Sequence, residues 1–243
     1  VSVFSSNDYG KTFTESKLDQ EGTSLVAPRV FRTSSDEFLL FATQGQNESF
    51  SLMTSSSEDG ITWSNFERFL PSLTMQNAFV PTLIPLENKD LVVFQASYSF
   101  ESRLSYQLYV TEKQKNTLYW SDATLVTNKV VSENPFTSYH NQRPSLLEFD
   151  NKLYMAWERM ENTAAEIWVA ELSKEGLIPK SSFVLADSAN SNRPIFFEYN
   201  NKLFLSWFDT RTSRESLYMA EQTGLSWETH TLVENANSNM FGY

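Results

Sequence analysis

Three arginines beside prolines are the residues of this sequence best suited to bind a charged ligand. Arg143 and Arg193 lie 50 positions apart and each directly precedes a proline, whereas Arg29 directly follows one. A guanidinium presents paired N–H donors in one plane, which match the two oxygens of a carboxylate. If these arginines converge on one point, they predict a clamp for a small anionic ligand.

Acidic and phenolic side chains form the second chemically competent group. Carboxylates and tyrosines can act as general acid, general base or nucleophile, for example in glycoside hydrolysis. No residue is assigned a catalytic role from the sequence. The candidate ligand-binding set comprises Arg29, Arg143, Arg193, Tyr98, Glu158, Asp209 and Arg211.

A structural role for the arginines is an equally direct interpretation. Arg-Pro recurs at the same position of an internal repeat, as expected of a residue that bonds carbonyls of a neighbouring repeat. The arginines would then pair with nearby acids, namely Glu148, Glu158, Glu198 or Asp209. Both interpretations stay open at this level.

Other chemistries have little support. The sequence has no cysteine, which excludes disulfides and thiolate catalysis. His140 and His230 are far apart in the repeat and offer no metal-ligand spacing. Seven glycines form no phosphate-binding loop. We therefore expect neither a cofactor nor a bound metal.

An internal repeat of about 50 residues defines the architecture. Residues 139–172 and 189–222 match position by position, and weaker copies begin near Pro28 and Pro81. In each copy a strand is expected to start near a proline, because the missing N–H of proline costs least at a strand start. These prolines are Pro28, Pro81, Pro144 and Pro194. Asn-rich turns and short apolar runs follow, with no period of 3.6. A repeat of this length built of short strands is typical of a β-propeller blade.

A second motif falls between the third and fourth strands of the repeat. Its spacing is Ser-x-Asp-x-Gly-x-Thr-aromatic, in which an acid accepts from turn N–H groups, glycine takes a positive φ and an aromatic ring packs between sheets. The three copies contain Ser6, Asp8, Gly10 and Phe13, then Ser56, Glu58, Gly60 and Trp63, and finally Gly224 and Trp227.

This motif resembles the Asp box, or BNR repeat, of the sialidase-like β-propeller family, and the resemblance covers nearly the whole chain. It implies that these turns are structural, because in the family they lie on the face opposite the active site. Sialidases carry an Arg-Ile-Pro element with the arginine two positions before proline. Here Val26, Phe79, Gln142 or Asn192 occupies that position. Because side chains alternate along a strand, the shift by one residue weighs against the sialidase clamp.

The predicted fold is all-β, a sialidase-type propeller of four-stranded antiparallel blades, expected to be six-bladed when complete. Residues 1–243 form a single propeller domain or an excerpt of one, with about four and a half blades. An alternative is that residues 1–17 pair with the C-terminal tail and close a thin blade. The predicted blades are residues 24–72, 78–128, 141–188 and 191–234, with a half blade at 1–21.

Charge and hydropathy limit the partners. The net charge of −11 disfavours binding to nucleic acid, because no basic patch can release counterions. No apolar run is long enough to insert into a membrane, and no signal peptide is present in this chain. A glycan or small anionic ligand remains possible, since a few arginines can converge locally. We expect an extracellular, periplasmic or cell-surface protein.

Two functions of different class follow. The favoured one is an exported, non-catalytic sialidase-like propeller that binds a ligand or glycan as the sensory or adhesive module of a larger protein. The alternative is an exo-sialidase-type glycoside hydrolase that holds the substrate carboxylate with the arginine cluster. The out-of-register arginines and the incomplete set of blades favour the binding module.

Overall fold

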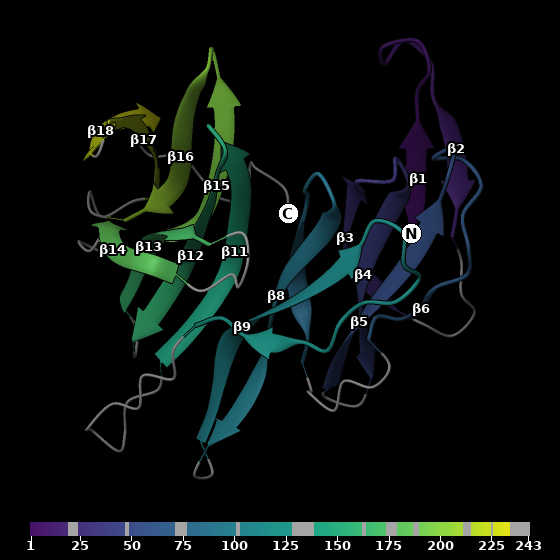
Figure 1. The fold of residues 1–243 in the computed structure, drawn as a ribbon, viewed down its shortest axis with the longest axis horizontal. Helices are drawn as coiled ribbons and strands as arrows, with labels where there is room; N and C mark the ends of the chain where they lie inside the picture. Colours follow the sequence, from purple (N-terminus) through teal and green to yellow (C-terminus); the bar gives the residue numbers. More distant parts are fainter. Residues whose placement is uncertain are drawn as a thin grey trace. The chain divides into compact units, whose positions relative to one another are not determined.

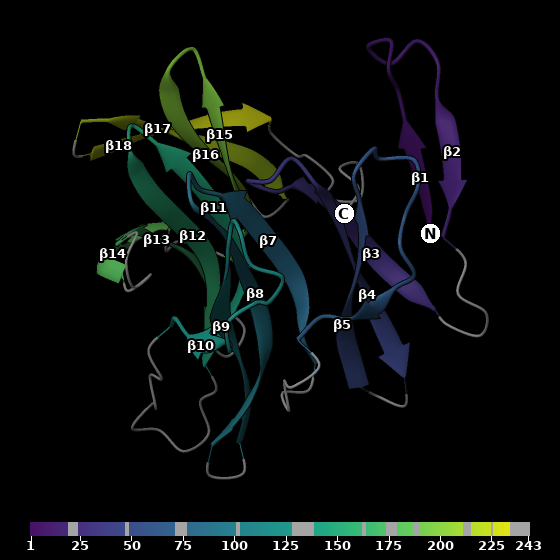
Figure 2. The same cartoon turned by 45° about the vertical axis from the view of Figure 1, so that its right-hand side comes forward.

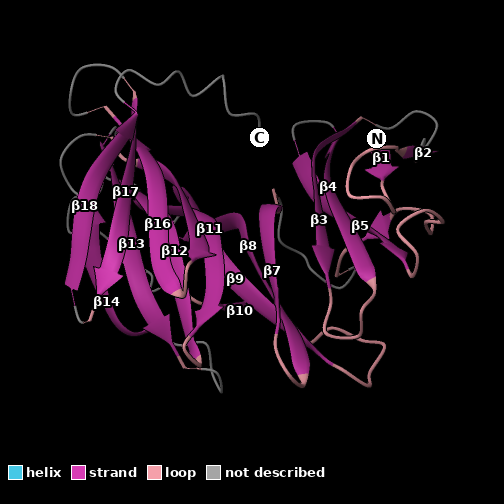
Figure 3. Cartoon of the chain, turned by 90° about the horizontal axis from the view of Figure 1, so that it is seen from above, coloured by secondary structure: helices cyan, strands magenta, loops and turns pink. Residues whose placement is uncertain are grey.

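In the computed structural model every regular element of the described residues is a β-strand (Figure 3). The structure describes residues 1–18, 24–46, 49–70, 77–100, 103–127, 139–161, 164–173, 179–186, 190–210, 215–224 and 226–233. Within them no helix is present that could cross a membrane. The chain divides into two compact units, each described by itself: unit 1 is residues 1–96 with 111–124, and unit 2 is residues 97–110 with 125–243.

Four four-stranded sheets follow one another along the chain, after a two-stranded ribbon (Figures 1 and 2). In each sheet the strands lie in sequence order, and every strand pair with a described register is antiparallel. The all-β prediction is confirmed. The number of blades in a complete propeller stays a prediction.

The strands of the ribbon and of the first two sheets have the following bounds. The ribbon consists of β1 (Ser2–Ser5) and β2 (Thr14–Lys17), and the first sheet of β3 (Leu25–Arg32), β4 (Phe38–Gln46), β5 (Ser49–Ser57) and β6 (Glu67–Arg68). The second sheet consists of β7 (Phe79–Pro85), β8 (Lys89–Phe100), β9 (Arg103–Gln114) and β10 (Thr124–Leu125).

The last two sheets belong to unit 2. One consists of β11 (Tyr139–Phe149), β12 (Lys152–Glu161), β13 (Ala164–Leu172) and β14 (Pro179–Ala186), and the other of β15 (Asn192–Tyr199), β16 (Lys202–Asp209), β17 (Ser216–Thr223) and β18 (Ser226–Val233).

Two-residue turns join the first two strands of these last sheets. Asp150-Asn151 and Asn200-Asn201 all have φ between 48° and 58°. Two consecutive positive φ values define the hairpin turn whose twist matches the flanking strands, and Asn and Asp tolerate that conformation best among residues with a side chain. The turn residues therefore fix the register Phe149↔Lys152 and Tyr199↔Lys202.

The four prolines lie inside the first strands rather than at their starts, which corrects the sequence prediction. In each sheet the register shifts at the proline, so that two residues face one on the second strand. The residue before each proline has φ between 51° and 55°. A β-bulge releases its residues from the ladder, so a proline without an N–H costs little there. The four residues are Ala27, Val80, Arg143 and Arg193.

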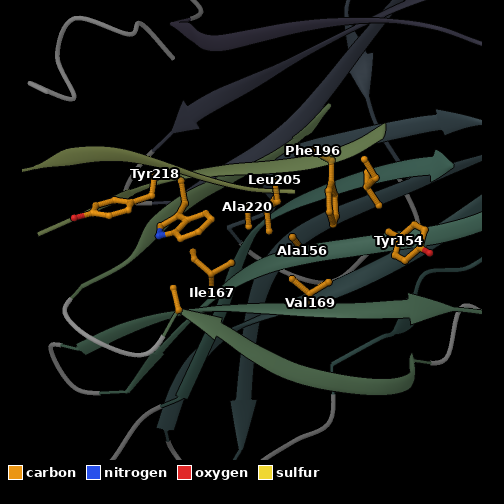
Figure 4. Close-up of a cluster of buried hydrophobic side chains, with 11 residues drawn as sticks. Tyr154, Ala156, Ile167, Val169, Phe196, Leu205, Tyr218 and Ala220 are labelled. Carbon is orange, nitrogen blue, oxygen red and sulfur yellow. The ribbon is translucent and has the colours of Figure 1, made fainter. Parts of the chain in front are cut away.

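The core of unit 2 lies between its two complete sheets (Figure 4). Tyr154, Ala156, Ile167 and Val169 of the β11–β14 sheet meet apolar side chains of the β15–β18 sheet, among them Phe196, Leu205, Trp207, Tyr218 and Ala220. Alternation along β12 and β13 sends one set of side chains to this core and the other set to the opposite face. In unit 1 a smaller cluster of Leu40, Ala42, Met53 and Phe66 packs against Val1, Val3, Leu18, Leu25 and Trp63.

In the first predicted Asp-box turn the aspartate accepts hydrogen bonds from the turn, as the sequence predicted. Asp8 Oδ1 accepts from the backbone N–H groups of Lys11 and Thr12, and Oδ2 accepts from Thr12 Oγ1 at 2.7 Å. Ser6 Oγ donates to Asp8 at 2.8 Å, and Gly10 has φ +83°. Phe13 does not pack between sheets as expected; it is 61 % exposed, because the two-stranded ribbon offers it no second layer among the described residues.

The second turn is one residue out of the predicted register. The acceptor is Asp59, which receives the N–H groups of Ile61 and Thr62 at 2.8 and 2.7 Å, whereas Glu58 is exposed. Its hydroxyl partner is Ser57 rather than Ser56. Asp59 lies one residue nearer the turn than Glu58, and its shorter side chain places the carboxylate within hydrogen-bonding distance of these amides. Gly60 has φ +71°.

The aromatic residues of the second and third turns are packed. Trp63 packs against the core of unit 1 and Trp227 against the core of unit 2. Gly224, in the third turn, has φ +66°. A further turn of the same plan was missed by the sequence analysis. There Thr111 Oγ1 donates to the carbonyl of Ser121 at 2.7 Å, as Ser55 Oγ does to Ser64 at 2.6 Å.

Candidate functional site

Glu158 is the most strongly held acid of unit 2. Its side chain is 3 % exposed, and Oε2 lies 2.7 Å from Arg143 Nη1. Oε1 accepts from the Gln142 amide, and Oε2 also accepts, at 3.4 Å, from the backbone N–H of Arg193. An ionised carboxylate buried to this degree needs such donors, because an unpaired charge in the interior is costly.

The bulges explain why these donors reach Glu158. Gln142 is paired with Glu158 and Ser145 with Ala156, so Arg143 and Pro144 together face Trp157. The extra residue re-aims the Arg143 side chain toward the second strand. In the next sheet the bulge at Arg193 leaves that backbone N–H free of the ladder, so it donates to Glu158 of the preceding sheet. Glu158 thereby joins two neighbouring sheets.

This geometry changes the role expected of Arg143. The sequence offered it either as part of a carboxylate clamp or as the partner of a nearby acid, and the structure shows the second arrangement. Its charge is matched by Glu158, although 37 % of its side chain stays exposed. Arg193 contributes its backbone N–H to the same carboxylate.

Asp209 lies at the end of β16, one repeat after Glu158. It is fully buried, and Oδ2 accepts from Ser191 Oγ at 2.8 Å and from Trp207 Nε1 at 3.4 Å. Ser191 is two residues before Arg193, whose N–H binds Glu158. The two carboxylates therefore take donors from one stretch of three residues that spans roughly 7 Å when extended.

A buried polar network holds the strand that carries Glu158. Asn141 Nδ2 and Thr127 Oγ1 both donate to Gln107 Oε1 at 2.9 Å, and Trp157 Nε1 donates to Asn141 Oδ1 at 2.9 Å. These four side chains are at most 5 % exposed. These three hydrogen bonds are all 2.9 Å long, and satisfied buried networks rigidify their surroundings. The network fixes Trp157, which directly precedes Glu158.

Of the remaining predicted ligand-binding residues, only the side chain of Arg29 is described, and it does not join this arrangement. Arg29 belongs to unit 1, where Nη1 donates to the carbonyl of Pro81 at 3.4 Å, a structural contact between first strands. Tyr98 is part of β8, but its side chain lies outside the described residues. Arg211 also lies outside them.

His140, on β11, is an acceptor in this region. Its Nδ1 accepts from the backbone N–H of Tyr106 at 3.2 Å, and the two rings lie 5.5 Å apart. Burial lowers the pKa of His140 below its usual value of 6.5. The neutral imidazole is the form that this hydrogen bond requires. Within the described ranges, no group of three or more His, Asp or Glu side chains could hold a metal ion.

Sequence reasoning missed Gln142, Asn141 and Gln107 as parts of the site. A signal was present for the first: an amide side chain precedes Arg-Pro in both clear copies, as Gln142 and Asn192. Nothing in the local sequence marks Gln107, because it reaches Asn141 from another sheet.

Comparisons with known proteins indicate a β-propeller fold. No family model matches the sequence, and no curated protein matches it. Solved structures do match. The Penicillium chrysogenum α-L-arabinanase complexed with arabinobiose shares 13 % identity at a TM-score of 0.64, over 94 % of this chain and 72 % of that one. The Bacteroides thetaiotaomicron endo-arabinase shares 14 % at 0.58, over 97 % and 85 %. The GH43 endo-arabinanase of Bacillus licheniformis shares 13 % at 0.56, over 86 % and 80 %.

These similarities support a β-propeller fold and correct two predictions from the sequence. The neighbours are arabinanases and related enzymes rather than sialidases, so neither the sialidase type nor the exo-sialidase activity is supported. The neighbours are also enzymes, which contradicts the favoured prediction of a non-catalytic binding module. The Asp-box spacing misled the analysis because it describes a local turn, which carries no information about the chemistry of a site elsewhere.

Proposed function

We propose that this protein is a glycoside hydrolase that acts on uncharged, arabinose-containing glycans. Its support is the fold, which resembles arabinanases over most of the chain. The observation that carries the proposal within the chain is the pair of buried acids, Glu158 and Asp209, which accept from residues 191–193 at the start of β15. Glycoside hydrolysis commonly uses two carboxyl groups, one as acid and one as base or nucleophile.

The contacts suggest different roles for the two acids. Glu158 is ion-paired with Arg143 and accepts from two further donors, which suits a carboxylate acting as base. Asp209, which accepts from a hydroxyl and an indole N–H, is proposed as the acid because Glu158 takes the other role. Both are buried, so the proposal requires Arg143, the exposed member of the set, to turn away from Glu158 when a sugar binds.

The ion pair between Arg143 and Glu158 bears on the charge of the substrate that can bind there. Because Glu158 already neutralises its charge, the pair has no net charge to offer and suits sugar hydroxyls, which accept from a guanidinium and donate to a carboxylate. The proposed substrates are polymers found outside cells, so an extracellular, periplasmic or cell-surface location stays part of this proposal.

The test is hydrolysis of linear arabinan and of an aryl α-L-arabinofuranoside. Glu158→Gln and Asp209→Asn are each expected to lower kcat at least about a hundredfold, the usual range for losing an acid or base. Glu198→Gln is the matched control, because Glu198 is an exposed acid on β15 away from the pair. An aryl sialoside serves as the negative substrate. No release of arabinose from either substrate by the unmodified protein contradicts the proposal.

A further inference from the structure

Arg159 is held between two aromatic rings on the face of the β11–β14 sheet opposite Glu158. Its Cζ lies 4.8 Å from the ring centroid of Tyr139 and 4.7 Å from that of Trp168. Arg159 follows Glu158 on β12, and successive side chains of a strand point to opposite faces. The Glu158 arrangement and the Arg159 stack are therefore separated by the sheet.

No carboxylate pairs with Arg159 in the part of the chain that the structure describes. Glu166 lies directly opposite Arg159 in the strand register, yet its Oε2 accepts from Trp168 Nε1 at 2.8 Å instead. The rings attract the cation but do not neutralise it. Arg159 is thus a half-buried, full positive charge that packs over two aromatic rings.

The stack is fixed by its surroundings. Trp168 is anchored by Glu166 and packs against Trp157, with centroids 6.0 Å apart. The carbonyl of Tyr139 accepts from Gln107 Nε2 at 3.2 Å. A guanidinium that packs over two rings keeps its five N–H donors in its own plane, where a planar ligand can meet them. Such a pre-organised fork loses little conformational freedom on binding.

We propose that Arg159 binds the carboxylate of an acidic sugar, a uronic acid, within a glycan. Two coplanar oxygens match the fork and a negative charge matches the unneutralised cation, whereas sugar hydroxyls would satisfy only the N–H groups. Tyr139, Arg159 and Trp168 are each partly exposed, so a ligand can reach the stack from solvent. This site is additional to the proposed hydrolytic one and does not depend on hydrolysis.

The first experiment compares trigalacturonate with its methyl ester by titration calorimetry of the intact protein. We expect the acid to bind at least tenfold more tightly than the ester, with an affinity that falls as salt is raised. Arg159→Gln and Arg159→Lys should each weaken binding of the acid at least tenfold, the lysine because it keeps the charge and loses the fork. Arg32→Gln, at an exposed arginine paired with Asp36, should have no effect.

Binding of acid and ester with equal affinity, or of neither, overturns the proposal, and so does unchanged binding by the folded Arg159 variants. If both variants fail to fold, the unmodified protein decides. The Nε–H signal of Arg159, displaced by the two ring faces, should move when trigalacturonate is added, and an unmoved signal overturns the proposal. Failure of arabinan hydrolysis leaves these outcomes unaffected.

Discussion

Arg143 and Glu158 form an asymmetric ion pair: Nη1 and Oε2 are 2.7 Å apart, and the side chains are 37 % and 3 % exposed respectively. In the intact pair water reaches part of the guanidinium, whereas the carboxylate is shielded from solvent. The bulge before Pro144 creates this arrangement, because it turns the arginine toward an acid that the regular alternation of β11 would not present to it.

The asymmetry predicts unequal effects of removing either partner. Arg143→Met leaves a buried carboxylate short of a donor and should lower the free energy of unfolding by about 1–3 kcal/mol, reduced from the fully buried case because solvent screens Arg143. Glu158→Gln should cost less than about 1 kcal/mol, since Gln142 can rotate its amide and Arg143 can hydrate. Denaturant unfolding measures both.

The double variant Arg143→Met with Glu158→Gln provides the control. If the cost of the arginine change arises from the stranded charge, the double variant should be more stable than Arg143→Met alone. Equal losses for the two single variants, with simple additivity in the double variant, would contradict the asymmetric pair.

The sequence predicted the architecture better than the chemistry, and the residues show why. Turn residues such as Asn200 and Asn201 act locally, so their type alone fixed the hairpins. The repeat likewise predicted four-stranded antiparallel sheets. The bulge was invisible, because a positive φ at Arg143 is not an intrinsic preference of arginine and depends on its neighbours. Gln107 and Arg193 reach the site from other sheets, a long-range relation that no local pattern encodes.

The pre-proline bulges predict a stabilising glycine substitution. Ala27 is exposed and has φ 52°, in the left-handed region that alanine avoids. Ala27→Gly should raise the free energy of unfolding by about 0.5–1 kcal/mol, because relief of the strain exceeds the entropic cost of glycine. Thermal unfolding by circular dichroism measures the change.

The matched control for Ala27 is Ala164→Gly at the start of β13. Ala164 is exposed too but has no positive φ. Glycine there should destabilise by about 0.5–1 kcal/mol, through backbone entropy alone. Loss of stability in both variants would mean that residue 27 does not adopt the left-handed conformation.

The pH dependence of Tm can test whether Asp59 or Glu58 is the acceptor in the second Asp-box turn. Hydrogen bonds from the backbone of Thr62 and Ile61 lower the pKa of Asp59 to about 2 from 3.8. A depressed carboxyl pKa stabilises the fold above pH 3.8 and loses that contribution as the pH falls toward 2. Asp59→Asn should therefore lower Tm at pH 5 and flatten its decline below pH 4. Glu58→Gln, at the exposed neighbour, should change neither; the reverse result would restore the register first read from the sequence.

His140 predicts a second pH dependence, in a different range. Burial holds its folded pKa below 6.5, so the folded state favours the neutral ring, which accepts from the Tyr106 N–H. At pH values between the folded pKa and 6.5, the imidazole of His140 binds a proton in the unfolded chain but not in the folded chain. Stability from this group is therefore present above pH 6.5 and falls as the pH drops through that window.

The measurement for His140 is Tm between pH 7.5 and 5. His140→Gln should remove the part of the decline that lies below pH 6.5, because glutamine does not titrate and its oxygen can still accept from Tyr106. His230→Gln is the matched control, since His230 is exposed and lies 3.8 Å from Glu228 of its own strand. Should the two variants have the same pH profile, neutral burial of His140 would be wrong.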